Sequence, residues 1–203
     1  LFMSKMSKKK VIGITGSMGS GKSEISRYLR KKYPVLDCDQ VNADLLKKGN
    51  LGYQKLNDLH IVELDSNGEI IKESLASYMF SNVEHRKQVE AILHPLIFDE
   101  MHKWIHEQES LIVFVEMPIL FEISAQEHFD SIWCVVADLD VALSRLQTYR
   151  NFTREQALAR LVSQMNPEEK MAKSDIVLRN NSTVEQLHMQ IEDALKEEKL
   201  NGD

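Results

Sequence analysis

The chain has 203 residues, enough to bury a sizeable α/β core with an insertion or two, and its acidic residues outnumber its basic ones by 31 to 25. The net charge of −6 excludes a basic surface over the whole chain for nucleic acid, and no apolar run approaches the length of a membrane span.

Cys38 and Cys134 lie in separate apolar stretches and predict free buried thiols in a reducing compartment, the cytoplasm. Residues 1–9 lack a signal-peptide pattern, and we expect them to be a tail outside the fold.

A short apolar run, residues 11–15, breaks into a glycine-rich turn that should hold phosphate. Residues 16–23 fit G-x-x-x-x-G-K-[ST] and are followed by a helix-forming run, residues 24–32. The glycines permit positive φ, so successive N–H groups can point at an anion that also lies at the positive end of the helix. Lys22 is expected to reach the β- and γ-phosphates and Ser23 to coordinate Mg²⁺. The alternative is a turn between strand and helix that binds nothing, and the match of both flanks to the motif disfavours it. The predicted ATP-binding residues here are Gly16, Ser17, Met18, Gly19, Ser20, Gly21, Lys22, Ser23 and Glu24.

A second short strand, residues 34–39, ends in two acids, Asp37 and Asp39. Residues two apart on an extended segment face the same way, and open α/β sheets bind ligands beyond the carboxyl ends of their strands. We therefore expect both carboxylates beside the glycine-rich turn, where one could take the proton of an attacking hydroxyl or hold the metal through water. The alternative for either residue is to cap the helix expected over 41–48, and one can cap while the other works.

Residues 42–106 are predicted to be mostly helical, with the turn 65–68 as one interruption, and to build the acceptor site of a kinase. Pro95 is expected to kink a helix over 83–107. Taken alone, His94 is better interpreted as a packing or capping residue than as a ligand.

The continuous apolar run 111–116 predicts a strand buried on both faces at the middle of a parallel sheet. It ends in Glu116, which is placed like the Walker-B carboxylate that contacts Mg²⁺ or its water shell. The next loop carries Glu122, for which an exposed loop acid is an equal alternative. Two further strands are predicted over 132–137 and 176–178, and a closing helix over 184–195.

Four arginines, at 145, 150, 154 and 160, lie on helical segments joined near residues 151–153. Guanidinium groups match the negative charge that phosphoryl transfer spreads over phosphate oxygens, so we expect a mobile, arginine-bearing lid. The alternative is a solvated basic helix face. We favour that alternative for Arg154, and a functional role for Arg145 and Arg150.

In this order the motifs resemble those of the dephospho-CoA kinase family. They cover the chain from residue 11 to about residue 195. The shared segments are the glycine-rich turn 13–23, Asp37-Cys38-Asp39 with Gly49, His94-Pro95, the loop 116–122, Arg145 with Arg150, Arg160 with Gln164, and Asp175 with Asn180. The chain departs from the family at Ala43, His60, Lys72 and Asn151, which concern the acceptor side more than the ATP side.

The resemblance implies a P-loop NTPase three-layer α/β fold with a five-stranded parallel sheet, a helical substrate-binding insertion and a helical lid. It implies a single kinase domain over 10–203, with the core at 10–41, 107–143 and 174–203, the insertion at 42–106 and the lid at 144–173. The implied reaction is ATP-dependent phosphorylation of the ribose 3′-hydroxyl of dephospho-CoA. The implied partners are ATP, Mg²⁺ and dephospho-CoA, without nucleic acid or membrane, in a monomer or weak homo-oligomer.

The resemblance also distributes roles among the residues. Asp39 is the general base, Asp37 supports the site, and Lys22 with Arg150 stabilises the phosphoryl group in transfer, with Arg145 also catalytic. The implied contacts are Asn180 to ATP, Ser23 and Glu116 to the metal, and Asp39, His94, Pro95 and Glu122 to the acceptor.

Two other functions stay open. Another P-loop kinase for a nucleotide or small molecule would keep the turn and the lid but lack the combination of the acid pair, His94-Pro95 and the loop 116–122. A GTP-binding switch would use residues 65–68, which spell D-x-x-G, but the chain has no N-K-x-D motif to read guanine.

Overall fold

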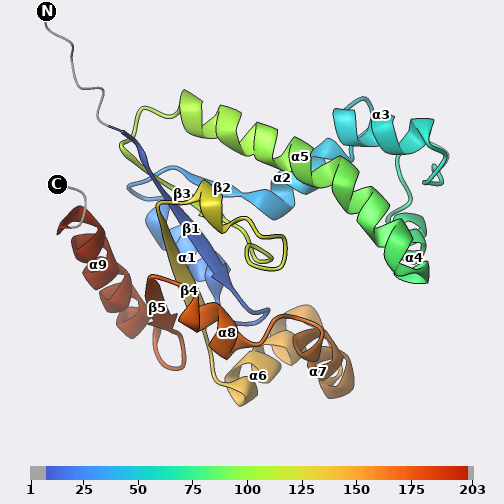
Figure 1. Ribbon diagram of the computed structural model, residues 1–203. Coiled ribbons are helices and arrows are strands. Elements are labelled where there is room, and N and C mark those ends of the chain that lie inside the picture. Colours follow the sequence, from blue (N-terminus) through green and yellow to red (C-terminus); the bar gives the residue numbers. More distant parts are fainter. Residues whose placement is uncertain (1–7, 201–203) are drawn as a thin grey trace, which may run out of the picture. The chain divides into compact units, whose positions relative to one another are not determined.

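The chain folds around a parallel sheet of five strands in the order β2-β3-β1-β4-β5 (Figure 1). The computed structural model describes residues 8–200, so residues 1–7 of the predicted tail lie outside the described residues. The strands are β1 (Lys10–Gly16), β2 (Val35–Asp37), β3 (Ile112–Glu116), β4 (Ser131–Val136) and β5 (Ile176–Arg179). The predicted fold class is confirmed, with one correction: β1, and not the longer apolar run at β3, is the central strand.

The chain divides into two compact units, which we describe separately. One contains the residues up to Leu36 and those from Gln108 onward, and the other contains Asp37–Glu107. The helices of the first unit are α1 (Lys22–Leu29), α6 (Leu139–Arg150), α7 (Arg154–Val162), α8 (Pro167–Ala172) and α9 (Val184–Leu200), with a 3₁₀ turn η1 (Gln126–His128). The helices of the second unit are α2 (Cys38–Leu45), α3 (Leu51–Asp58), α4 (Lys72–Ser81) and α5 (Val83–Glu107).

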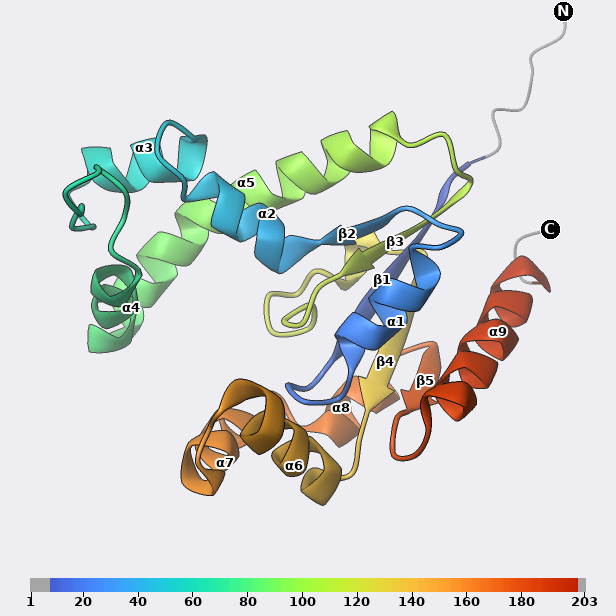
Figure 2. The ribbon, with the colours of Figure 1, turned by 180° about the vertical axis from the view of Figure 1, so that it is seen from behind.

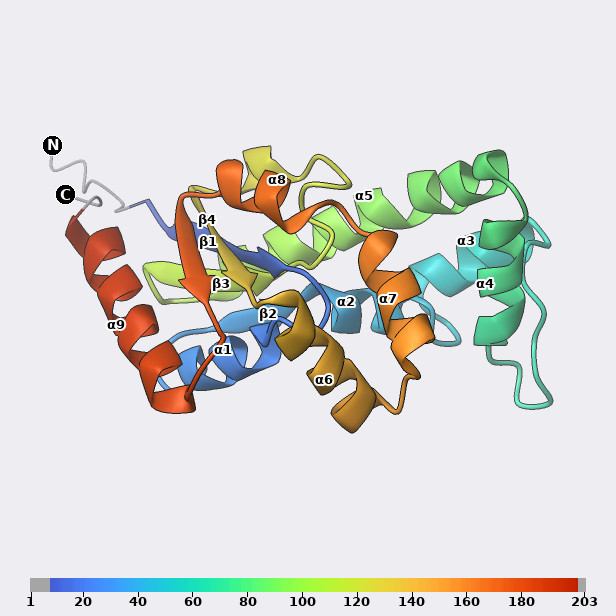
Figure 3. The same cartoon turned by 90° about the horizontal axis from the view of Figure 1, so that it is seen from below.

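The core of the first unit lies between the sheet and two helices, α1 and α9 (Figure 2). Ile12 and Ile14 of β1 point to this side because residues two apart on a strand share a face, and they pack with Ile25 of α1 and Ile191 of α9. Figure 3 shows α8 on the opposite side of the sheet. Thr15, which alternates with Ile14, therefore faces the α8 side at the carboxyl end of β1.

The second unit is built from helices alone, apart from a short turn. Leu56, Ile61, Leu75, Val89 and Leu93 form its buried cluster, to which α3, α4 and α5 contribute. Helix α5 is continuous through Pro95, where the sequence predicts a kink. Within residues 8–200, none of the helices is both long enough and apolar enough to cross a membrane.

Helix α3 ends at a residue with left-handed backbone geometry. His60 has φ of +55°, its N–H donates to Asn57 O at 3.0 Å, and the N–H of Ile61 donates to Leu56 O at 3.2 Å. This pair of bonds is the Schellman motif, in which glycine is the favoured residue at the left-handed position. A side chain at this position therefore costs conformational energy.

We expect His60→Gly to stabilise the chain by roughly 1 kcal/mol, because glycine adopts positive φ without the Cβ penalty. Urea unfolding followed by circular dichroism measures the change. Lys55→Gly, at an exposed position inside α3, is the matched control and should destabilise by about 0.5–1 kcal/mol. A destabilised His60→Gly protein would mean that the imidazole makes a contact worth more than the backbone strain.

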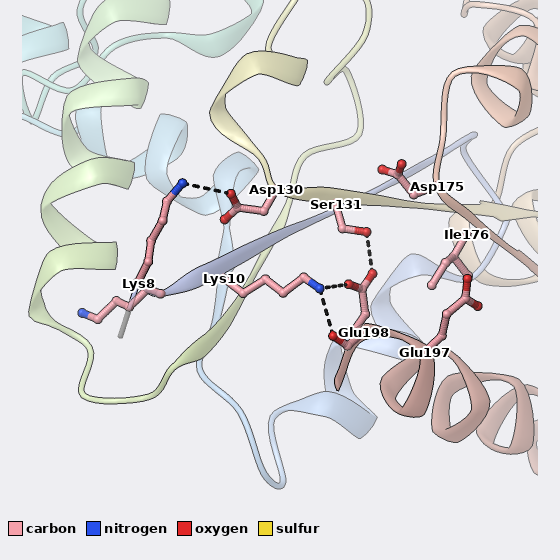
Figure 4. A pocket seen from close by; sticks show the side chains of 9 residues that line it. Lys8, Lys10, Asp130, Ser131, Asp175, Ile176, Glu197 and Glu198 are labelled. Carbon is pink, nitrogen blue, oxygen red and sulfur yellow. Dashed lines mark hydrogen bonds and ion pairs between the residues drawn. The ribbon is translucent and has the colours of Figure 1, made fainter. Parts of the chain in front are cut away.

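A buried carboxylate, Glu198, fastens α9 to the amino-terminal ends of β1 and β4 (Figure 4). Its side chain is 3% exposed, with Lys10 Nζ 2.7 Å from Oε2 and Trp133 Nε1 donating to Oε1 at 2.8 Å. Ser131 Oγ also donates to Oε1. Burial raises the pKa of Glu198, but the bonds from Lys10, Ser131 and Trp133 outweigh burial and hold the pKa below its usual 4.5. The carboxylate lines a shallow cavity of about 440 Å³ with exposed neighbours such as Glu197.

Glu198→Gln should lower the free energy of unfolding at pH 7 by roughly 2–3 kcal/mol, because it leaves the Lys10 ammonium without its counter-charge. A depressed carboxyl pKa stabilises the folded state fully above the unfolded value of 4.5, and this contribution is lost as the pH falls through the folded pKa. The variant should therefore lose part of the acid-induced drop in stability, as measured by urea unfolding between pH 7 and pH 4. Glu197→Gln at the exposed neighbouring position should change stability by less than about 0.5 kcal/mol.

Candidate active site

The glycine-rich turn closes directly onto the strands beside it. Gly16 has φ of +151° and Gly21 has φ of +96°. A Cβ on Gly16 would lie 2.3 Å from Val135 O, and one on Gly21 would lie 2.1 Å from Asn180 Nδ2. Both positions therefore require glycine, for backbone geometry and for lack of space.

Lys22 is the first residue of α1, and its side chain bends back over the turn. Its Nζ donates to Gly16 O at 3.0 Å and to Ser17 O at 2.8 Å. The helix begins without a side-chain cap at Gly21, so the N–H groups of its first turn face the glycine-rich turn together with the positive end of the helix. An ammonium group and a helix N-terminus thus meet at one concave turn, which is a phosphate-binding arrangement.

Two predicted site residues, Arg145 and Asn180, brace this turn through its carbonyl oxygens. Arg145 Nη1 donates to Gly19 O at 3.1 Å, and its Nη2 donates to Asn180 O at 2.8 Å. Asn180 is buried, and its Nδ2 donates to Ser20 O at 3.0 Å. These bonds fix the turn against α6 and the end of β5.

Glu24 was predicted to bind ATP, but its carboxylate points toward α9. It accepts bonds from Arg27 and lies 3.2 Å from His188 Nε2. Burial raises the pKa of Glu24, but the bonds to Arg27 and His188 outweigh burial and lower it overall. The side chain is therefore held as an anion by its own neighbours, and its backbone N–H donates to Gly21 O at 3.1 Å.

The predicted lid, residues 144–173, covers the end of α6 and all of α7 and α8, and α6 and α7 are joined by residues 151–153 as expected. Thr153 and Gln156 form a reciprocal capping box that starts α7. Arg150 and Arg154 are exposed, whereas the guanidinium of Arg160 lies 4.7 Å from the centre of the Phe152 ring.

The segment that follows α7 contacts the glycine-rich turn. Gln164 Oε1 accepts a hydrogen bond of 3.0 Å from the N–H of Met18. Gln164 was not among the predicted site residues, although the resemblance to the kinase family included it. Its carbonyl oxygen holds a backbone donor of the kind that phosphate oxygens use in such turns.

Glu116, at the carboxyl end of β3, is held against α1. Its Oε2 accepts a hydrogen bond of 2.5 Å from the buried Ser26 Oγ. Ser23 and Ser26 are three residues apart and lie on the same face of α1, so Glu116 lies against the face that carries Ser23. Ser26 was missed by the sequence reasoning, although its spacing from Ser23 was a usable signal.

The oxygen atoms of Ser23 and Glu116 fit the preference of Mg²⁺ for hard ligands. Among the described residues 8–200, no group of three or more His, Cys, Asp or Glu side chains could hold a metal ion alone.

Glu122 lies beside a cation that the sequence did not reveal. Lys170 of α8 is fully buried, and its Nζ lies 3.1 Å from Glu122 Oε1 and donates to Pro118 O at 3.0 Å. Glu122 is an exposed residue of the loop, as the alternative interpretation expected, but its carboxylate is paired with Lys170.

In the second unit, the two predicted acids have different positions. Asp37 ends β2, and its Oδ1 accepts from the N–H groups of Asp39 at 2.9 Å and Gln40 at 3.4 Å, so it is the N-cap of α2. Asp39 lies in the first helical turn and not on an extended strand, so the expectation that both side chains face the same way is wrong. The alternative in which one acid caps is correct for Asp37.

His94 is half-buried on α5, next to Pro95. Burial lowers its pKa, and the nearby Glu90 opposes this shift.

The D-x-x-G sequence at residues 65–68 is an ordinary turn, because Asp65 Oδ1 accepts from the N–H groups of Asn67 at 2.8 Å and Glu69 at 3.0 Å. Its carboxylate is thus used locally, which removes the observation that favoured a GTP-binding switch.

Comparisons with known proteins agree with this geometry. The family model described as Dephospho-CoA kinase matches residues 10–186. A dephospho-CoA kinase from Bacillus cereus is 34% identical, over 92% of this chain and 96% of the relative, and one from Fusobacterium nucleatum is 31% identical, over 90% and 95%. Among solved structures, TT1252 from Thermus thermophilus is 32% identical with a TM-score of 0.82, over 94% of this chain and 98% of that chain.

More distant structures share the fold. A shikimate kinase from Acinetobacter baumannii is 14% identical with a TM-score of 0.56, over 96% of each chain. A likeness at this identity supports the P-loop kinase fold alone. The family model and the two bacterial relatives carry the closer assignment: the chain belongs to the dephospho-CoA kinase family.

Proposed function

We propose that the chain carries out the reaction of its family, ATP-dependent phosphorylation of dephospho-CoA at the ribose 3′-hydroxyl, with the residue roles given below. The observation that carries the proposal is the glycine-rich turn, where Lys22 and the N-terminus of α1 converge on one concave backbone. Backbone N–H groups from Gly16 to Glu24 would hold the phosphates of ATP. The phosphate oxygens would replace the Gly16 and Ser17 carbonyls as acceptors for Lys22, in stronger charge-assisted bonds.

Ser23 and Glu116 would hold Mg²⁺, which when bound supplies positive charge to the phosphate oxygens. Ser26 supports this role, because its hydroxyl fixes one oxygen of the Glu116 carboxylate. Arg145 and Asn180 would preserve the shape of the turn during binding. Arg150, exposed at the end of α6, would stabilise the phosphoryl group in transfer, for which guanidinium geometry is well suited.

Asp39 is the proposed general base that takes the proton of the acceptor hydroxyl. The capping bonds that Asp37 accepts support this assignment, because they occupy the other acid of the pair and fix the first turn of α2 that carries Asp39. Asp37 therefore acts as a positioning residue in the proposal. His94 and Pro95 on α5 are proposed contacts for the acceptor, and the lowered pKa of His94 favours its neutral form there.

We further propose that the enzyme works in the cytoplasm as a monomer or weak homo-oligomer, without nucleic-acid or membrane partners. The buried free thiols of Cys38 and Cys134 support a reducing compartment. The net charge of −6 gives no overall attraction for nucleic acid.

A coupled ADP-release assay with a panel of acceptors tests the reaction. Dephospho-CoA should give turnover, whereas AMP and shikimate should give rates near background. A rate with AMP or shikimate and none with dephospho-CoA would move the chain to another P-loop kinase activity.

Lys22→Met, which removes the ammonium but keeps much of the side-chain length, should lower kcat by about 10³-fold with dephospho-CoA, since it removes charge stabilisation of the transferring group.

Asp39→Asn should lower kcat by about 10²–10⁴-fold and leave the affinity for ATP within about twofold, because it removes a base used only in the chemical step. Initial rates and calorimetric titration with an ATP analogue measure the two effects. Asp58→Asn, an exposed change of the same type on α3, is the control and should keep normal turnover. Turnover close to normal in Asp39→Asn would assign that carboxylate to the helix alone.

A further inference from the structure

Lys170 is a fully buried cation whose side-chain partners, Glu122 and Pro118, both lie in the loop that follows β3. It lies on α8, with a side chain 0% exposed, and contacts the loop that follows β3. Its Nζ lies 3.1 Å from Glu122 Oε1 and donates to Pro118 O at 3.0 Å. Because a buried ammonium group is unfavourable without a counter-charge, the position of Glu122 is tied to that of Lys170.

The same carbonyl joins a third element to this contact. Thr15 Oγ1, at the carboxyl end of β1, donates to Pro118 O at 3.0 Å. Pro118 O thus accepts bonds from Lys170 and from Thr15, which is also fully buried. Helix α8, the loop after β3 and the end of β1 therefore meet at one carbonyl oxygen.

Each of the three elements leads directly to the proposed active site. Thr15 is followed by Gly16, where the glycine-rich turn begins. Pro118 is two residues after Glu116, whose carboxylate lies against α1. Helix α8 follows the segment in which Gln164 holds the N–H of Met18. A shift of the Lys170 ammonium would move the supports of the turn, of Glu116 and of the lid together.

We propose that Lys170 is a positioning residue for phosphoryl transfer, and that Glu122 is its counter-ion and not a contact for the acceptor. Lys170 has no exposed surface from which to touch a substrate, so it acts through Pro118 and Glu122. Glu122 is 25% exposed, but its carboxylate oxygens both face Lys170, at 3.1 Å and 3.3 Å from Nζ. The inference rests on the proposed function for its kinetic readout.

A double-mutant cycle with Lys170→Met and Glu122→Gln tests the proposal. Each single change should lower kcat with dephospho-CoA by about ten- to hundredfold, as expected when reacting groups are displaced by about 1 Å, and should leave the KM for dephospho-CoA within about twofold. The double variant should be no slower than the slower single variant, because both changes break the same contact. Thermal melts report the fraction of folded enzyme, to which each rate is normalised.

Lys196→Met is the matched control, since it makes the same change at an exposed position on α9 and should keep a normal kcat. A raised KM for dephospho-CoA in Glu122→Gln but not in Lys170→Met would overturn the proposal and make Glu122 an acceptor contact. A normal kcat per folded molecule in Lys170→Met would also overturn it and leave the pair with a role in stability only.

The proposed function fails separately from this inference, because the wild-type rate with dephospho-CoA tests it before any variant is made. If that rate were absent, the same cycle would be measured as the affinity for ADP by calorimetry, which needs no acceptor. A weakening of about tenfold or more in both single variants, with no further loss in the double variant, would support the positioning role, and unchanged affinity would overturn it.

Discussion

The first unit depends on one constraint: the glycine-rich turn must keep its backbone shape while no phosphate is bound, so its polar backbone groups need partners within the protein. The structure meets this constraint with side-chain cations and amides directed at carbonyl oxygens. Lys22 binds the oxygens of Gly16 and Ser17, and Arg145 and Asn180 bind those of Gly19 and Ser20. Because Arg145 and Asn180 hold the oxygens of Gly19 and Ser20 independently of Lys22, the turn is preorganised before any phosphate arrives, and little of the binding energy is spent on ordering it.

Buried charge occurs at both ends of the sheet and has a different consequence at each. At the amino-terminal end, Glu198 accepts from Lys10, Ser131 and Trp133 and so joins α9 to β1 and β4. This contact lies at the opposite end of the strands from the glycine-rich turn. At the carboxyl end, Lys170 joins α8 to the loop after β3. Both groups are compensated, as buried charges must be. The contacts of Glu198 stabilise the fold away from the proposed site. The contacts of Lys170 involve the elements that carry the residues of that site.

The sequence predicted the parts of the fold and site that are encoded locally. Glycine spacing, the apolar strands and the joint between α6 and α7 follow from residues next to one another, and they agree with the structure. The apolar run at β3 indicated burial on both faces, but it could not rank β3 and β1 in the sheet, because both strands are interior. The pair of Glu122 and Lys170 was missed for a related reason. Its partners are 48 residues apart, and nothing near Lys170 marks it as buried.

Asp37 and Asp39 could not be told apart from the local sequence. Both Asp37 and Asp39 precede or begin a helix, and either type of position suits an acid. Their spacing on a strand would have placed the two carboxylates side by side. The chain turns into α2 already at Cys38, which leaves Asp37 as the cap and puts Asp39 one position into the first turn. A boundary earlier by three residues than expected therefore separates two side chains that the strand pattern had treated as equivalent.

The departures from the family pattern can be interpreted in the same physical terms. His60 and Asn151 both have positive φ, of +55° and +54°, at the ends of α3 and α6. Asparagine tolerates this conformation because its short polar side chain can hydrogen-bond locally, whereas histidine gains less from it. Glycine, common in the family at position 60, would satisfy the same backbone requirement. The departure at His60 therefore concerns how α3 ends. The prediction that departures from the family pattern affect binding of the acceptor then depends on Ala43, Lys72 and Asn151.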